Sequence, residues 1–300
     1  MSAASCASSL ALWLCLAVCP ACIRARGTDV PRYESTPEDV ALAERLMDGL
    51  AARADAEPSA ELMVRAAKGL LGQPYVAGTL EGGEERLRIY LTKTDCILFA
   101  ETCLGLVRTV QRKGAQATFE DLAQTLQGTR YRDGVVDGYA SRLHYTTEWI
   151  RQGEQTGVFE DLSEALGGVR DAREIDFMSK HPDSYAPLKG ESQYAKDNRG
   201  RIRAMEARVS AMPRFYIPKE GLAAVEDRIQ SGDILCIATS VDGLDYSHVV
   251  IAYREKPGDR LTFIHASTSA KKVVVEPRTL EAYLRANARA LGISVLRVRR

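Results

Sequence analysis

The chain has 300 residues, with 40 basic and 40 acidic side chains and a formal net charge of zero. This length suits one large domain or two small ones. The neutral balance argues against broad nucleic-acid binding, which needs a basic excess, and the ordinary hydrophobic content argues against disorder.

The first predicted element is a short apolar segment over 10–18. Four of the seven cysteines lie in the first 22 residues: Cys6, Cys15, Cys19 and Cys22. The segment is too short to span a membrane comfortably and polar sequence follows it, so we expect 1–22 to be a secretory signal peptide. No basic residue precedes it, however. Two alternatives stay open. The chain could be lipidated at Cys19 or Cys22, or it could be a cytosolic protein whose start codon has been placed too far upstream.

Two helices and a strand are predicted next. A threonine N-cap, a proline and two acidic residues begin a helix over 37–53. Ser59 is expected to cap a second helix over 59–71. A loop over 78–83 and an alternating strand over 87–91 then follow.

Cys96 is the candidate nucleophile. It follows Asp95 and begins an apolar segment whose spacing predicts a largely buried helix. A helix N-terminus lowers the pKa of a cysteine, and the thiolate is the reactive form. Cys103 and Cys236 fall in apolar stretches and are expected to be inert buried residues.

The region over 118–229 is predicted to be mainly helix and loop, with an exposed loop over 179–200 and a charged helix over 193–210. Arg142, His144 and Tyr145 stand in it as a distinctive polar block. Two roles stay open for the block. It could line the cleft, with arginine binding a carboxylate, or it could form a buried network that holds this region against the sheet.

Four strands are predicted near the C-terminus, over 234–238, 249–253, 261–265 and 273–275. A turn at 257–258 would place His265 opposite Val250, which shares a sheet face with His248. The two imidazoles would then be diagonal neighbours that face one cysteine. Helices followed by an antiparallel sheet indicate an α+β fold, and no linker divides 28–300, so we expect a single domain there.

This arrangement permits amide hydrolysis. Cys96 would attack a carbonyl carbon, His248 would take the thiol proton and protonate the leaving amine, and His265 would orient His248. The amide N–H of Cys96 would contribute to an oxyanion hole. None of the four histidines forms a zinc-binding pattern, so no metal or organic cofactor is predicted.

Several motifs occur in a characteristic order: Thr94-Asp95-Cys96, Ser141-Arg142-Leu143-His144-Tyr145, Gly243-Leu244-Asp245-Tyr246-Ser247-His248 and His265-Ala266-Ser267. From about Leu70 to the C-terminus the chain resembles the bacterial N-acetylmuramoyl-L-alanine amidase-like family, within the NlpC-type, papain-like cell-wall cysteine hydrolases.

The resemblance implies a papain-like NlpC-type fold, with N-terminal helices and a nucleophile helix packed on a central antiparallel sheet. A large, mainly helical insertion would occupy about 104–230. It implies a catalytic triad of Cys96, His248 and His265. The candidates for substrate binding lie before the nucleophile and within the motifs. They are Tyr75, Glu81, Asp95, Arg142, His144, Tyr145 and Ser247.

The implied reaction is hydrolysis of the amide bond between N-acetylmuramic acid and L-alanine, in peptidoglycan or muropeptides. The implied location is the periplasm, with membrane contact only through an N-terminal lipid. Two alternatives stay open, a stem-peptide endopeptidase and a non-catalytic muropeptide-binding protein. Leu98 and Val250 depart from the family pattern, and we expect them to remove a hydroxyl near the nucleophile and to narrow the pocket.

Overall fold

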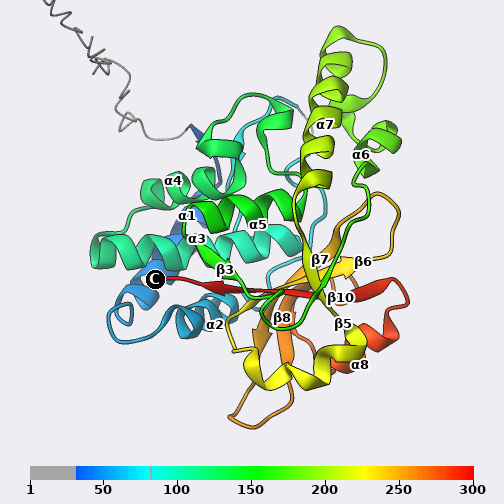
Figure 1. Cartoon of the computed structure of the whole chain (residues 1–300). Helices are drawn as coiled ribbons and strands as arrows, with labels where there is room; N and C mark the ends of the chain where they lie inside the picture. Colours follow the sequence, from blue (N-terminus) through cyan, green and yellow to red (C-terminus); the bar gives the residue numbers. More distant parts are fainter. Residues whose placement is uncertain (1–31, 82) are drawn as a thin grey trace, which may run out of the picture.

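The computed structural model describes residues 32–81 and 83–300, so the predicted signal segment lies outside the described residues. The fold is mixed α/β, with a central antiparallel sheet between a large helical layer and a smaller one (Figure 1). None of the helices described is both long enough and apolar enough to cross a membrane.

The main sheet has eight strands in the order β4-β5-β10-β6-β7-β8-β9, and β3 also pairs with β10. Its strands are β3 (Phe159–Asp161), β4 (Val169–Arg170), β5 (Phe215–Pro218), β6 (Ile234–Thr239), β7 (Tyr246–Tyr253), β8 (Thr262–Ser267), β9 (Lys272–Val275) and β10 (Ala290–Val298). The segment predicted as a mainly helical insertion therefore contributes three strands, β3 to β5, to the sheet.

The longest strand, β10, is absent from the sequence prediction. It lies between β5 and β6, and its residues are buried on both faces of the sheet. A strand buried on both faces shows no alternation of apolar and polar residues. Its position depends on partners far away in the chain, such as Ile237 opposite Ile293.

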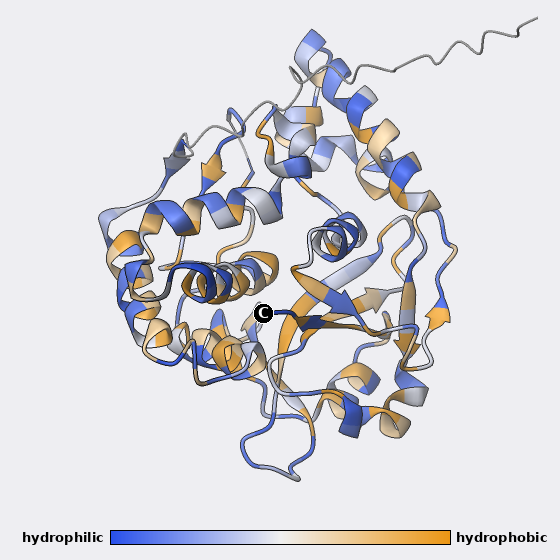
Figure 2. Ribbon diagram, turned by 60° about the vertical axis from the view of Figure 1, so that its left-hand side comes forward, coloured by the Kyte–Doolittle hydropathy of each residue, from blue (hydrophilic) through white to orange (hydrophobic). Residues whose placement is uncertain are grey.

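Five helices cover one face of the sheet (Figure 1). They are α1 (Pro37–Ala51), α2 (Ser59–Gly69), α3 (Cys96–Lys113), α4 (Phe119–Arg130) and α5 (Thr146–Gln155). The small α8 (Leu280–Ala286) packs on the opposite face. Figure 2 shows that the strands are largely hydrophobic and that the helices around them carry both hydrophobic and hydrophilic residues. The burial of two apolar sheet faces is the main source of stability in this arrangement.

The start of α1 is confirmed, because Thr36 and Asp39 form a capping box. Ser59, in contrast, is the first helical residue of α2 rather than its cap, and it is buried. The strand predicted over 87–91 is also shorter. Only β2 (Leu87–Arg88) forms a strand, parallel to β1 (Tyr33–Glu34), and the N–H of Ile89 still donates to the carbonyl of Glu34 at 2.9 Å. Beyond it, the carboxylate of Asp39 accepts the backbone N–H groups of residues 91 and 92 at 2.8 Å each.

The exposed loop predicted over 179–200 is wrong in part. Leu188 within it is completely buried. The charged helix predicted over 193–210 is confirmed as α7 (Gln193–Ala211). Together with α6 (Phe177–Lys180), this segment builds a third apolar cluster that includes Tyr145 and Met205. Figure 1 shows α7 projecting beyond the sheet.

The histidine hairpin has the predicted register. β7 pairs with β8 so that Ile251 opposes Ile264, and one step further along the same register His265 opposes Val250. His248 and His265 therefore point to the same face, as the turn position indicates.

Candidate active site

Cys96 is the first residue of α3, partly exposed to a cleft between this helix and β7. Asp95 caps the helix, because its carboxylate accepts the N–H of Leu98 at 3.0 Å. The backbone N–H groups of Cys96, Ile97 and Val249 are directed at the sulfur. The nucleophile candidate thus lies beside the strand residue that follows His248.

The thiol of Cys96 is neutral at physiological pH. Its surroundings bury the sulfur and the carboxylate of Asp95 lies beside it, and together they raise the pKa of Cys96 to about 11. The lowering expected from a helix N-terminus is outweighed, because burial disfavours the thiolate and the cap itself carries a negative charge. Cys96 therefore needs a base that takes its proton as it reacts.

The two histidines contact each other directly. Nε2 of His248 lies 2.8 Å from Nδ1 of His265, and the two rings are nearly perpendicular. Burial, followed by the neighbouring His265, lowers the pKa of His248 to about 3. His248 is consequently a neutral imidazole with Nε2 occupied, which leaves Nδ1 as the ring nitrogen available to the cleft.

His265 lies behind His248, buried among Phe263, Tyr283 and Glu276. Burial lowers the pKa of His265 to about 4. Its Nε2 is 3.4 Å from a carboxylate oxygen of Glu276. His248, His265 and Glu276 thus follow one another from the cleft into the protein, and we refer to these three residues as the histidine line.

The cleft has a volume of about 220 Å³ and is lined by Cys96, Ile97, Ser247 and His248 on the sheet side. The opposite wall comes from the segment over 104–230 together with Glu81. Its side chains include Leu143, His144, Tyr145, Met178 and Tyr185. The predicted insertion therefore helps to enclose the candidate nucleophile.

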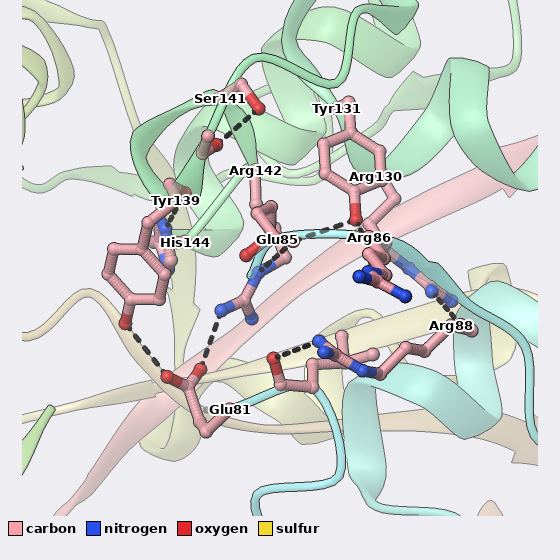
Figure 3. A network of polar contacts seen from close by, with 12 residues as sticks. Glu81, Glu85, Arg86, Arg88, Arg130, Tyr131, Tyr139, Ser141, Arg142 and His144 are labelled. Carbon is pink, nitrogen blue, oxygen red and sulfur yellow. Dashed lines mark hydrogen bonds and ion pairs between the residues drawn. The ribbon is translucent and has the colours of Figure 1, made fainter. Parts of the chain in front are cut away.

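Arg142 also lines the cleft, and it lies at the centre of a polar network (Figure 3). Its Nη2 donates to Glu81 at 2.8 Å, its Nε lies 3.3 Å from Glu85, and the hydroxyl of Tyr139 donates to Glu81 at 3.0 Å. Glu85 in turn accepts from the hydroxyl of Tyr131 at 2.8 Å. We call these five residues the arginine network.

The geometry favours the structural role for Arg142. The guanidinium is 8% exposed and faces two glutamates, and those carboxylates raise its pKa against the effect of burial. A charge already neutralised twice is poorly placed to bind the carboxylate of a ligand. Glu81, whose side chain is 34% exposed, is the charged member of the network that is most open to the cleft.

His144 is a neutral residue of the cleft wall. Its Nε2 lies 2.8 Å from the carbonyl oxygen of Tyr139, which must accept, so Nε2 carries the hydrogen and Nδ1 is an acceptor. Burial, followed by the charge of Arg142, lowers the pKa of His144 well below its ordinary value. Tyr145 also lines the wall, but its hydroxyl donates to Glu206 at 2.7 Å within the third apolar cluster.

Two further candidates lie beside the cleft rather than along it. Asp95 is occupied as the cap of α3, and Tyr75 packs against the main core. Burial, then the nearby Cys96 and Asp95, raise the pKa of Tyr75. Ser247 does line the cleft and is exposed.

The AmiA-like family, described as N-acetylmuramoyl-L-alanine amidase-like, matches the chain over residues 65–293. This protein belongs to that family. An N-acetylmuramoyl-L-alanine amidase from Bacteroides uniformis is 34% identical in sequence. The match covers 81% of this chain and 99% of that one, with a TM-score of 0.74. The family and this neighbour indicate an amidase-type hydrolase that acts on peptidoglycan.

Two other solved structures are also similar. A Bacteroides fragilis protein described as a candidate xylanase is 35% identical, with 78% of this chain and 99% of that one covered and a TM-score of 0.71. A Legionella pneumophila protein is 19% identical, with 88% and 97% covered and a TM-score of 0.64, which supports the fold alone. No curated protein matches the chain.

The two departures from the pattern of the AmiA-like family do not shape the cleft. Leu98 and Val250 are completely buried, and neither lines the cleft. Val250 packs in the core between the sheet and α8. The expected narrowing of the pocket by Val250 is therefore wrong, because its side chain points into a different layer.

Sequence reasoning missed Glu276 and the partners of Arg142. Glu276 follows β9, and its backbone N–H donates to the carbonyl of Phe263 at 2.9 Å. This pairing continues the β8–β9 register in which His265 opposes Val274. The same parity argument that joined the two histidines could have found Glu276 as the next diagonal neighbour.

Proposed function

We propose that this protein is an exported cysteine amidase with an NlpC-type, papain-like fold. It hydrolyses the bond between N-acetylmuramic acid and L-alanine in peptidoglycan or muropeptides. The observation that carries the proposal is the neutral His248, held at Nε2 by His265 and open at Nδ1, beside Cys96 in one cleft. Family membership supplies the class of bond.

In the first step, Nδ1 of His248 takes the thiol proton while Sγ of Cys96 attacks the muramoyl carbonyl carbon. The N–H groups of Cys96 and its neighbours, at the N-terminus of α3, stabilise the negative oxygen that forms. His248 then passes the proton to the alanine nitrogen, the C–N bond breaks, and the stem peptide leaves as an amine.

In the second step, a water molecule gives a proton to His248 and attacks the thioester on Cys96. The C–S bond breaks, the proton returns to sulfur, and the muramic acid leaves with a free carboxyl group. Both steps need a neutral imidazole at the start, and the low pKa of His248 provides it at neutral pH.

The side chains of the opposite wall favour binding of the sugar part of this substrate. Glu81 presents carboxylate oxygens that each hold one donor already, and His144 presents an unprotonated Nδ1. Both groups accept hydrogen bonds, which suits the hydroxyl and amide N–H groups of an N-acetylated sugar. Glu81 and Glu85 already balance the charge of Arg142, so a peptide carboxylate would gain little there, and this favours the amidase over the stem-peptide endopeptidase.

Export through residues 1–22, a single hydrolase domain over 28–300 and a lipid at Cys19 or Cys22 are part of the same proposal. The apolar stretch over 10–18 supports export and lipidation. Mass spectrometry of the mature protein from its native membrane and soluble fractions tests these two. A chain that begins beyond residue 18 is expected, and a chain retaining Met1 would contradict export.

The reaction is tested by incubating purified muropeptides, with and without a 1,6-anhydro end, with the protein and with Cys96→Ala. Mass spectrometry of the products is expected to show free sugar and intact stem peptide with the wild type and neither with the variant. Shortened peptide still attached to sugar would identify an endopeptidase. Binding without cleavage would identify a muropeptide receptor.

A further inference from the structure

Glu276 is a buried carboxylate that the mechanism above does not use. It is 6% exposed, lies at the inner end of the histidine line, and places Oε2 3.4 Å from Nε2 of His265. The rest of the His265 ring is surrounded by the aromatic rings of Phe263 and Tyr283. Nε2 of His265 forms no other hydrogen bond within the described residues, and Oε2 of Glu276 is the carboxylate oxygen at ion-pair distance from it.

The carboxylate is held in place from its other side. Arg278 donates from Nε to Oε1 at 2.6 Å and from its backbone N–H to the same oxygen at 3.3 Å. Both bonds use Oε1, so Oε2 is left for His265. Burial opposes ionisation, but the hydrogen bonds from Arg278 hold the pKa of Glu276 below its ordinary value.

We propose that Glu276 is a positioning residue that sets the tautomer of both imidazoles in the histidine line. This inference rests on the proposed function for its catalytic meaning. A carboxylate can only accept hydrogen bonds, so its negative charge 3.4 Å away favours the tautomer of His265 that carries the hydrogen on Nε2, and Nδ1 of His265 then accepts. Nε2 of His248 therefore donates to that nitrogen, and Nδ1 of His248 keeps its lone pair.

The order of donors and acceptors thus has one direction, from Cys96 through both rings to Glu276. If the donors and acceptors ran in the opposite direction, Nδ1 of His248 would carry a hydrogen and could not accept the proton of Cys96. The carboxylate has a second effect. When His248 takes the proton of Cys96, the positive charge that forms beside His265 is stabilised by the negative charge behind it.

The charged and titratable groups around His265 come from three parts of the chain. They are His248 on β7, Glu276 and Arg278 after β9, and Tyr283 on α8. Arg278 disfavours a charged imidazole, whereas Glu276 favours it. Removing only the charge of Glu276 therefore leaves Arg278 unopposed.

The test is Glu276→Gln, which keeps the shape of the side chain but lets an amide N–H face His265. Long-range proton–nitrogen NMR of histidine-labelled protein at pH 7 reports which ring nitrogen carries the hydrogen. We expect hydrogens on Nε2 of both His248 and His265 in the wild type, and a change to Nδ1 or a mixture in the variant. We expect kcat to fall about 10- to 100-fold, less than the roughly 100- to 10,000-fold expected for loss of the base itself, with KM little changed.

Two further variants separate positioning from folding. Glu276→Asp keeps an acceptor and is expected to retain the wild-type tautomers, with part of the activity. Glu281→Gln makes the same change on α8, where the carboxylate pairs with Arg260 and Arg285 outside the histidine line, and is expected to leave tautomers and kcat unchanged. Thermal unfolding of each variant shows that the protein compared is folded.

The proposal is overturned if the wild type carries the hydrogen on Nδ1 of His265, or if Glu276→Gln keeps both Nε2–H tautomers and the full kcat. The NMR result does not need a substrate. If the wild type cleaves no muropeptide, the proposed function fails, while the tautomers still decide the role of Glu276.

Discussion

The histidine line and the arginine network are two polar groups beside one cleft, and they differ in charge. In the histidine line, two neutral imidazoles follow each other, with one hydrogen bond between them. In the arginine network, one cation faces two carboxylates, and tyrosine hydroxyls occupy further acceptor positions. The first arrangement can accept and move a proton, whereas the second holds ions that are already neutralised and therefore holds shape.

The largest effect is expected in the histidine line. His248→Ala removes the base, and kcat should fall about 100- to 10,000-fold, because the thiol of Cys96 is neutral without help. The midpoint of thermal unfolding of His248→Ala should change far less than that of Arg142→Met. Steady-state cleavage of a muropeptide and calorimetry measure the two quantities. A variant that keeps wild-type kcat would contradict the assignment of the base.

The arginine network should respond in the opposite way. Arg142→Met leaves Glu81 and the buried Glu85 without their shared cation, so we expect the free energy of unfolding to fall by about 3–5 kcal/mol. The kcat of the folded protein should fall far less than in His248→Ala. Arg86→Met is the control, because Arg86 pairs with Glu84 on the surface at 2.6 Å and its loss should hardly change the free energy of unfolding. Equal losses for the two variants would show that the network does not hold the wall.

The pH dependence of kcat/KM sharpens the same contrast. An ordinary histidine base would lose about thirtyfold in activity between pH 7 and pH 5, because protonation removes the lone pair. With the pKa of His248 at about 3 and that of His265 at about 4, kcat/KM should stay nearly constant over this range. An acid limb near pH 6.5 would contradict a buried, neutral base.

The same depressed pKa values affect stability in a known direction. The unfolded chain binds protons at its histidines more readily than the folded one, so stability is fully present above pH 6.5 and is lost as pH falls toward 4. Circular dichroism at pH 5 therefore has to accompany the rate measurement, so that loss of fold is not read as loss of base.

The smallest effect is expected at the acceptor wall. His144→Phe keeps a ring of similar size but removes the Nδ1 acceptor, so KM should rise about tenfold, or 1.4 kcal/mol, while kcat stays close to wild type. His181→Phe is the control, since that histidine is exposed and stacks on Phe177 away from the cleft. Unchanged KM in both variants would remove His144 from the binding surface.

Sequence patterns predicted the features that depend on local geometry. The capping box at Thr36, the start of α3 at Cys96 and the shared face of His248 and His265 follow from helix-start chemistry, strand parity and a turn, and the structure has all three. The family was also predicted correctly from short motifs. These features need only residues a few positions apart, or one hairpin.

Features that depend on distant partners were missed. Arg142 could not be assigned a role, because its partners Glu81 and Glu85 lie about 60 positions earlier in the chain. The pKa of Cys96 was expected to be low, since the sequence shows the helix start but not how deeply the sulfur is surrounded. The central strand β10 was missed because burial on both faces removes its alternation.

The most direct measurement of the central claim is mass spectrometry of the protein after rapid mixing with a muropeptide and quenching in acid. The mechanism predicts a muramoyl group attached to the peptide fragment that contains Cys96, and its loss in Cys96→Ala together with turnover. Turnover by Cys96→Ala at the wild-type rate, or an adduct that carries a stem-peptide acyl group instead of the sugar, would contradict the proposed amidase.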